Sequence, residues 1–309
     1  MKTKNLILFL SVMLLLYACT GGAGTGSTGG IDIKFTEVPE KEVYEGEEIF
    51  ATILITNSLV NEGGIQGILC LRDTLSDNYG GIPDNACADV NLPPATRTDG
   101  GVSPYVMEIN FPEVSPISPY RGIEREISKS YQNLPIIADF KYSVETTAGA
   151  VVCIKLPGAV SPNIPKDCGT KQTLSVQQPS MPLKISKLTV TPSRRGSNNV
   201  LLNIEMTISK SKQGLLLSSG EISGGVPAVA SVSLDVLANQ DSAGCQQVSN
   251  GRISIRSNEN EKVIKCALSI NDLSQDYINV PITVRMKYGF AESVVGTTIS
   301  ILKGDELVV

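Results

Sequence analysis

Alternation between apolar and polar residues is the feature that most constrains the fold of this chain. In the run 202–209, Leu-Asn-Ile-Glu-Met-Thr-Ile-Ser, every second residue is apolar. A period of two buries one face of an extended strand and leaves the other in solvent. The same pattern recurs in residues 49–55, 232–236, 264–270 and 280–286, and no stretch of comparable length has helical periodicity. The sequence therefore predicts an all-β protein.

An internal repeat divides the chain. LPIIADFKY, residues 134–142, aligns with VPITVRMKY, residues 280–288, and Pro, Ile, Lys and Tyr match at an offset of 146 residues. A weaker repeat relates residues 31–35 to residues 183–187, where each half begins. Two copies of one strand order predict a tandem array. About seven to nine short strands in each half suit an immunoglobulin-like β-sandwich, with a closed barrel as the alternative.

The boundary between the halves is predicted in the Pro-rich segment 177–182, QQPSMP. Such a segment can act as a semi-rigid spacer. We therefore expect a first β-sandwich domain in residues 31–178 and a second in residues 179–309.

The N-terminus has the order of a secretory signal. Residues 1–5 carry two lysines, residues 6–16 are apolar apart from Ser11, and Ala18 precedes Cys19. The apolar run is shorter than the roughly 20 residues that span a bilayer as a helix. Residues 1–18 are therefore predicted to be a signal peptide that directs export.

Leu16-Tyr17-Ala18-Cys19 resembles the lipobox of prokaryotic lipoproteins, although Tyr17 replaces the usual small residue. The resemblance implies that the Cys19 thiol receives diacylglycerol and that Cys19 becomes the first mature residue. The alternative is an ordinary signal peptide followed by an incidental cysteine. Residues 19–30 would then be the lipidated cysteine and a Gly/Ser/Thr tether spanning roughly 18 Å. We expect an exported protein, lipid-anchored to the membrane and facing the extracellular or periplasmic side.

Composition excludes several classes of function. Loss of Lys2 and Lys4 with the signal peptide leaves 24 basic and 31 acidic residues, a net charge of −7, which argues against a nucleic-acid partner. Histidine is absent, so Ser-His-Asp and Cys-His devices and imidazole metal ligands are excluded. Ser128-Lys129 and the run from Ser209 to Lys212 lack the Gly-rich elbow of a nucleophile. We expect no enzyme and no cofactor.

Six cysteines remain once Cys19 is assigned to lipid, and an even number suits disulfides in an oxidising compartment. Their spacing favours local pairing, with Cys70–Cys153 as the rival pair in the first half. Each local loop would stabilise the protein by roughly 3 kcal/mol. The six are Cys70, Cys87, Cys153, Cys168, Cys245 and Cys266.

VYEGEEIFATILITNSLVNEGG, residues 43–64, contains a Gly-Glu pair, an alternating strand, and an Asn before a Gly-containing turn. It resembles the start of the adhesion-related immunoglobulin-like or fibronectin type III-like (CARDB-like) modules of bacterial and archaeal surface proteins. The tandem layout, with a cysteine after the Tyr-containing strand, is also similar to that of archaeal surface proteins. The resemblance implies tandem β-sandwich domains and supplies no catalytic residues.

Two groups of residues are candidates for binding. Between Cys70 and Asn91 the acidic residues could bind Ca²⁺, although turns use the same residue types and the spacing is not that of an EF-hand. The candidate ligands are Asp73, Asp77, Asp84 and Asp89. Tyrosines in or near loops could contact a glycan or a protein; these are Tyr79, Tyr105, Tyr120 and Tyr131. Tyr142 and Tyr288 occupy matching strand positions and are predicted to be core or corner residues.

Together these features predict a non-enzymatic binding or structural lipoprotein, with a role in adhesion or envelope interaction. A protein or glycan partner is expected. The alternatives are a component of an envelope or secretion assembly and a carboxylate-dependent hydrolase.

Overall fold

The protein is all-β, as the alternating pattern predicts. The computed structural model describes residues 30–60, 64–75, 81–83, 86–99, 101–112, 120–121, 131–156, 158–196, 198–222, 227–271, 273 and 275–303. Within these ranges the chain forms strands and turns and no helix, so nothing in them could cross a membrane as a helix.

Ten strands precede the first long strand. They are β1 (Ile31–Glu37), β2 (Glu42–Tyr44), β3 (Glu48–Ile49), β4 (Ala51–Asn57), β5 (Ile65–Arg72), β6 (Cys87–Leu92), β7 (Thr96–Thr98), β8 (Gly101–Ser103), β9 (Tyr105–Phe111) and β10 (Tyr120–Arg121).

Two very long strands enclose the remaining nine. The order is β11 (Tyr131–Lys155), β12 (Gln172–Leu174), β13 (Leu183–Arg194), β14 (Val200–Lys210), β15 (Leu215–Leu217), β16 (Val229–Ala238), β17 (Asp241–Ser242), β18 (Gly244–Cys245), β19 (Arg252–Arg256), β20 (Glu261–Ile270) and β21 (Tyr277–Leu302).

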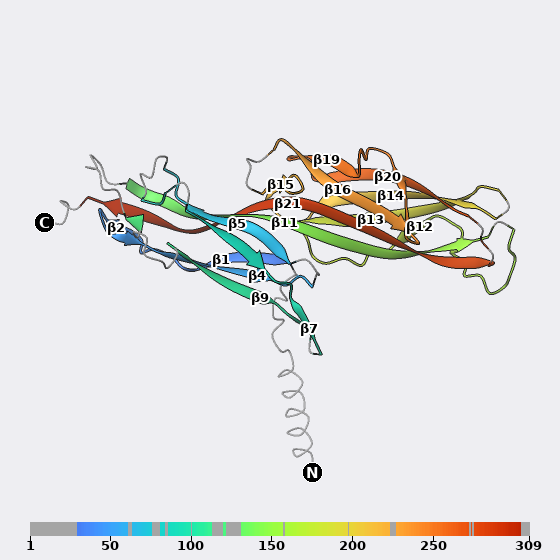
Figure 1. Ribbon diagram of the computed structural model, residues 1–309, viewed down its shortest axis with the longest axis horizontal. Coiled ribbons are helices and arrows are strands. Elements are labelled where there is room, and N and C mark those ends of the chain that lie inside the picture. The colour runs from blue at the N-terminus through green and yellow to red at the C-terminus, as the bar shows by residue number, and fades with distance from the viewer. Residues whose placement is uncertain are drawn as a thin grey trace, which may run out of the picture.

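A ribbon of β11 and β21 runs the length of the elongated molecule and joins its two lobes (Figure 1). The first lobe contains β1–β10 with the start of β11 and the end of β21. The second lobe contains β12–β20 with the remaining parts of both long strands. A three-stranded sheet, β1-β4-β9, belongs to the first lobe, and a five-stranded sheet, β12-β13-β14-β20-β18, belongs to the second.

The central sheet has nine strands and draws on both halves of the sequence. Along it the order is β17-β16-β21-β11-β5-β6, and β2, β15 and β19 pair off this path. The predicted ranges 31–178 and 179–309 therefore share one sheet through the β11–β21 ribbon.

The internal repeat forms a local two-fold arrangement. Tyr142 lies opposite Phe290, and Tyr288, its equivalent at an offset of 146, lies opposite Val144. Ser143 and Gly289 are opposite one another and are themselves 146 residues apart. The two copies of the repeat therefore run antiparallel within one ribbon, about an axis between Ser143 and Gly289.

The outer sheets of the two lobes begin with the same order of three paired strands. In the first lobe the edge strand β1 pairs with β4, which pairs with β9. In the second lobe β13 pairs with β14, which pairs with β20. All these pairings are antiparallel, and β1 and β13 both contain a register shift. The weak sequence repeat at residues 31–35 and 183–187 thus corresponds to two equivalent starting strands.

Apolar residues on alternate positions form the core. In β14 the side chains of Leu202, Ile204 and Met206 are buried, while the residues between them are exposed or half-buried. Tyr142 and Tyr288 are fully buried, so they are core residues, one of the two roles predicted for them. The ring of Tyr142 stacks on Phe140, with a centroid distance of 4.8 Å.

The Pro-rich segment 177–182 is bonded to strands β11 and β13, so its predicted role as a spacer is wrong. The backbone of Gln177 forms reciprocal hydrogen bonds with Gly149 of β11. The side-chain amide of Gln178 both donates to and accepts from the backbone of Ile185, and Met181 is buried. Because β11 continues past the centre of the molecule, this segment lies beside it and does not hold two bodies apart.

Three disulfides form between cysteines that are near in sequence: Cys70–Cys87, Cys153–Cys168 and Cys245–Cys266. These are the local pairs favoured by spacing, and Cys70 does not bond Cys153. Two of them join directly opposed positions of neighbouring strands, in β5–β6 and in β18–β20. Three disulfides indicate an oxidising, extracytoplasmic environment.

Candidate functional site

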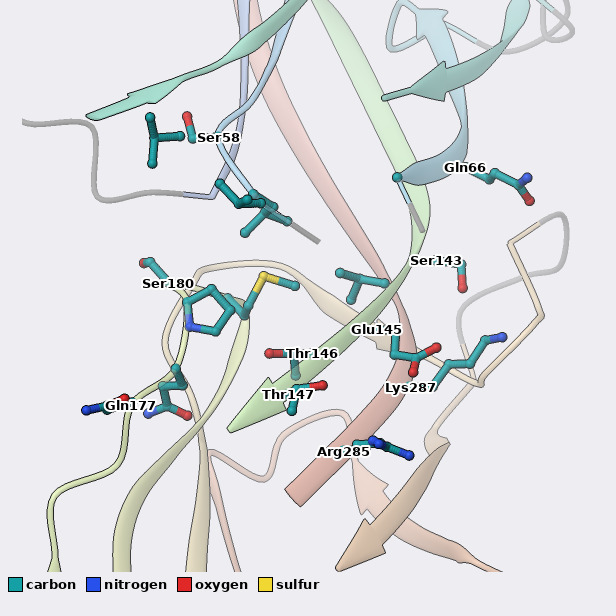
Figure 2. A pocket seen from close by; sticks show the side chains of 18 of the residues that line it. Ser58, Gln66, Ser143, Glu145, Thr146, Thr147, Gln177, Ser180, Arg285 and Lys287 are labelled. Carbon is teal, nitrogen blue, oxygen red and sulfur yellow. The ribbon is translucent and has the colours of Figure 1, made fainter. Parts of the chain in front are cut away.

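A groove of about 1120 Å³ lies at the centre of the ribbon, where the lobes meet. We call it the waist groove. Figure 2 shows that β11 carries Ser143, Glu145, Thr146 and Thr147 along it. Its lining comprises residues 58–60, 64, 66, 97, 102, 143–147, 177–181, 285 and 287. The groove thus combines both long strands with loops from each lobe.

An open strand edge runs along this groove. Strand β5 pairs with β11 only as far as Ser143, opposite Gln66, and the next backbone contact on that edge is Gly149 with Gln177. The N–H and C=O groups of Gly149 point away from β21, because both bond Gln177. Backbone groups alternate in direction along a strand, so those of Glu145 and Thr147 also point outward. Among the described residues these four groups have no backbone partner.

The other edge of the ribbon is closed at the equivalent place. Strand β15 pairs with residues 289–291 of β21, which correspond to residues 143–145 of β11. Leu216 and Leu217 of β15 are buried there. On the open edge β5 covers Ser143, the equivalent of Gly289, but no described strand covers Glu145, the equivalent of the β15-paired Ala291.

The groove is cationic within an acidic protein. Arg97, Arg285 and Lys287 line it, and Glu145 is the one carboxylate among the described lining residues. Lys287 lies directly opposite Glu145 across the ribbon, and Arg285 lies opposite Thr147. Figure 2 shows the Glu145 and Lys287 side chains together on this face, with Arg285 nearby. The excess of cations over carboxylates in the groove lining favours an anionic partner, although the whole chain has a net charge of −5.

Apolar side chains complete the lining. Leu59, Val144 and Met181 are buried at the wall, while Val102 is 51% exposed. A bound segment could thus place alternate side chains against apolar surface and near cationic groups. This two-sided character suits an extended peptide, whose side chains alternate in direction.

A buried ion pair joins the lobes on the closed side of the ribbon. The Lys212 ammonium group contacts the Glu292 carboxylate and also donates to the backbone oxygen of Ile31, at 2.7 Å. The Glu292 side chain is only 8% exposed. Burial raises the pKa of the Glu292 carboxyl above its ordinary value, and the neighbouring Lys212 opposes part of that rise. Lys212 therefore fastens the start of β1 to the ribbon.

The two repeat tyrosines differ in their hydrogen bonding. The Tyr288 hydroxyl accepts the Leu183 N–H at 3.0 Å. The Tyr142 hydroxyl lies near the Glu292 carboxylate, but it has no partner within hydrogen-bond geometry among the described residues. Burial raises the pKa of both phenols. Equivalent positions in the repeat thus have different local roles.

The candidate calcium ligands fall partly outside the described structure. Asp77 and Asp84 lie outside the described residues. Asp73 is buried after β5 and its carboxylate accepts the Leu75 N–H at 2.7 Å, as in an Asx turn. Asp89 is exposed on β6. Within the described ranges no three acidic or cysteine side chains cluster closely enough to hold a metal ion.

Two of the four candidate contact tyrosines have described side chains. Tyr79 lies outside the described residues, as does the side chain of Tyr131. Tyr105 is 37% exposed at the start of β9, and Tyr120 is half-buried in β10. Of the described side chains, neither Tyr105 nor Tyr120 lines the waist groove.

The signal peptide, Cys19 and most of the tether also lie outside the described residues, which begin at Gly30. The backbone oxygen of Gly30 accepts the N–H of Ser58 at 2.9 Å, and Ser58 lines the groove. The chain therefore enters the fold at its waist and not at either tip.

No protein-family model matches the chain, and no curated protein matches it.

The groove was not predicted from the sequence. Its cations lie 188 and 190 residues apart along the chain, at Arg97, Arg285 and Lys287, and only the fold brings them together. The one local signal is the run VPITVRMK, residues 280–287. In it Arg285 and Lys287 lie on the exposed face of the strand and alternate with Val284 and Met286 on the buried face.

Proposed function

We propose that this is an exported, non-enzymatic surface protein that is anchored to the membrane by lipid on Cys19 and binds a protein partner in the waist groove. A role in adhesion or envelope interaction follows from that location. The three disulfides support export, because they belong to an oxidising compartment. The lipobox-like sequence before Cys19 supports the anchor.

The body is proposed to be a pair of immunoglobulin-like β-sandwich domains, residues 31–178 and 179–309. Each lobe has an outer antiparallel sheet and a share of the nine-stranded sheet, and their buried residues form one continuous apolar cluster. Exchange of long strands between the two repeats would account for the shared ribbon.

The open edge of β11 is the observation that carries the binding proposal. Exposed strand edges are templates for pairing with another chain, and proteins usually cover or charge them. Here the edge lies within a groove whose walls are formed by both lobes, so a segment bound there gains side-chain contacts in addition to backbone hydrogen bonds. The absence of histidine from the sequence supports the non-enzymatic part of the proposal.

Residue-specific photocrosslinking on intact cells tests this function. A probe at Val102 projects from an exposed position of the groove lining, and a matched probe at Val263, 46% exposed on β20, reports on an unrelated face. We expect one protein to be captured repeatedly from Val102 and not from Val263. Equal capture from both positions, or none from Val102, would refute the groove as a binding site.

A further inference from the structure

We infer that the waist groove accepts residues 304–309 of a second copy of this chain as an added β-strand. This inference rests on the proposed function of the groove and names its partner. The segment reads Gly-Asp-Glu-Leu-Val-Val and follows the end of β21.

The groove's own symmetry indicates what kind of strand it accepts. On the closed side of the ribbon, β15 supplies Leu215-Leu216-Leu217 to the edge of β21. On the open side β5 already covers Ser143, so a three-residue apolar strand of the same kind would pair with residues 145–147, two positions beyond the span equivalent to β15. Leu307-Val308-Val309 is such a segment, and valine favours extended backbone.

Charge complementarity supports the same occupant. Asp305 and Glu306 come immediately before the apolar residues of the segment. Arg97, Arg285 and Lys287 line the groove with Glu145 as the opposing charge. Glu145 already lies opposite Lys287, and Arg285 also faces Asp235 across β21, outside the groove. Arg97 lies opposite Val102, so it is the groove cation with no carboxylate at its paired position, and Arg285 is the second arginine of the lining.

Residues 304–309 are too far from the waist groove of their own chain to bind there. Gly289, at the centre of the ribbon, and Leu302, at the end of β21, are separated by about 43 Å of strand at roughly 3.3 Å per residue. Residues 303–309 span at most about 25 Å even when fully extended. Figure 1 shows β21 ending at the tip of the first lobe, beside β2, far from the waist. The segment can fill this groove only in another copy.

The predicted contact is head to tail, from the tip of one molecule to the waist of the next. The patches on the two partners differ, so the contact does not close on itself as a two-fold dimer does, and it can propagate. Backbone pairing would use the outward N–H and C=O groups of Glu145 and Thr147.

Sedimentation of the exported full-length chain carrying Cys19→Ser tests the inference, because this change removes lipid-driven association. We expect the average mass to rise with concentration in the micromolar range and to fall on adding salt. Thr147→Pro removes one outward N–H without touching the bonds to β21, and should weaken association about tenfold or more. Val151→Pro, at an exposed residue of β11 that points the same way beyond the groove, is the matched control and should leave association unchanged.

A charge exchange identifies the two surfaces. Asp305→Lys with Glu306→Lys should abolish self-association, and so should Arg97→Glu with Arg285→Glu. Mixing the two variants should restore association, because each tail then meets a groove of opposite charge, and the two variants should alternate along the assembly. A wild-type chain that stays monomeric, or association unaffected by Thr147→Pro, would overturn the inference.

The failure of this inference is distinguishable from the failure of the proposed function. Capture of a different protein from Val102 on cells, with a chain that is monomeric in solution, would leave the groove as a binding site but not for a second copy. Capture of nothing, with a monomeric chain, would remove both.

Discussion

Replacement of Tyr288 by phenylalanine tests the argument that the two equivalent tyrosines differ in their hydrogen bonding. The Tyr288 hydroxyl is fully buried and accepts the N–H of Leu183, itself 2% exposed. Tyr288→Phe leaves that N–H without a partner. A buried unsatisfied donor costs about 1–3 kcal/mol, so we expect the free energy of unfolding to fall by about 2 kcal/mol.

Tyr142→Phe is the matched control, because it removes the same atom from the equivalent position of the repeat. The Tyr142 hydroxyl lies near the Glu292 carboxylate but outside hydrogen-bond geometry in the described structure. We expect a change of at most about 0.5 kcal/mol, as for the removal of an unpaired hydroxyl. Urea unfolding at neutral pH, followed by far-ultraviolet circular dichroism, gives both values. A Tyr288→Phe variant as stable as the wild type, or equal losses for the two variants, would refute the reasoning.

Three further predictions concern the ion pair, a packed glycine and the anchor. Burial raises the folded-state pKa of the Glu292 carboxyl above its ordinary value of 4.5. The carboxyl therefore contributes most to the stability of the fold below pH 4.5, and this contribution is lost as the pH rises through the raised pKa. The urea midpoint of Glu292→Gln should accordingly rise relative to that of the wild type between acid and neutral pH, and an unchanged difference would contradict this. Gly67→Ala places a methyl group 2.6 Å from the backbone oxygen of Lys141 and should cost about 1–3 kcal/mol, whereas Gly149→Ala meets nothing within 4 Å and should leave the thermal midpoint unchanged or higher. Cys19→Ser should move the exported protein from the membrane fraction to the soluble fraction, and retention on the membrane would count against the lipid anchor.

Local patterns of the sequence predict the local structure of the fold. The alternation in residues 202–209 predicts β14 and its buried face, and it does so because a strand has a period of two. Cysteine spacing favours the three observed disulfides, since each pair lies close along the chain. The repeat marks Tyr142 and Tyr288 as equivalent, and both are buried.

Long-range pairing could not be predicted in the same way. A repeat at an offset of 146 residues is compatible with two bodies placed end to end and with two strands paired antiparallel. The side-chain pattern of residues 134–142 is the same in both cases, because it depends on which face is buried and not on which strand lies alongside. The sequence pattern therefore does not predict the pairing of β11 with β21. For the same reason it does not predict that the segment 177–182 lies beside β11.

The open edge of β11 is invisible to sequence patterns for a related reason. Glu145 and Thr147 look like the exposed positions of any half-buried strand. Whether their backbone groups are paired depends on where β5 begins, at Ile65, more than 70 residues earlier in the chain. Only the three-dimensional arrangement distinguishes a covered edge from an open one.

Entry of the chain at Gly30, beside the groove residue Ser58, determines how a tethered molecule would be oriented. An elongated molecule that is tethered near its centre lies along the membrane surface more readily than it stands upright on it. The height of its tips above the membrane is then set by the short tether and the thickness of the body, not by the length of the ribbon. Encounters would occur sideways, with neighbours on the same membrane, more readily than across a gap to an opposing cell.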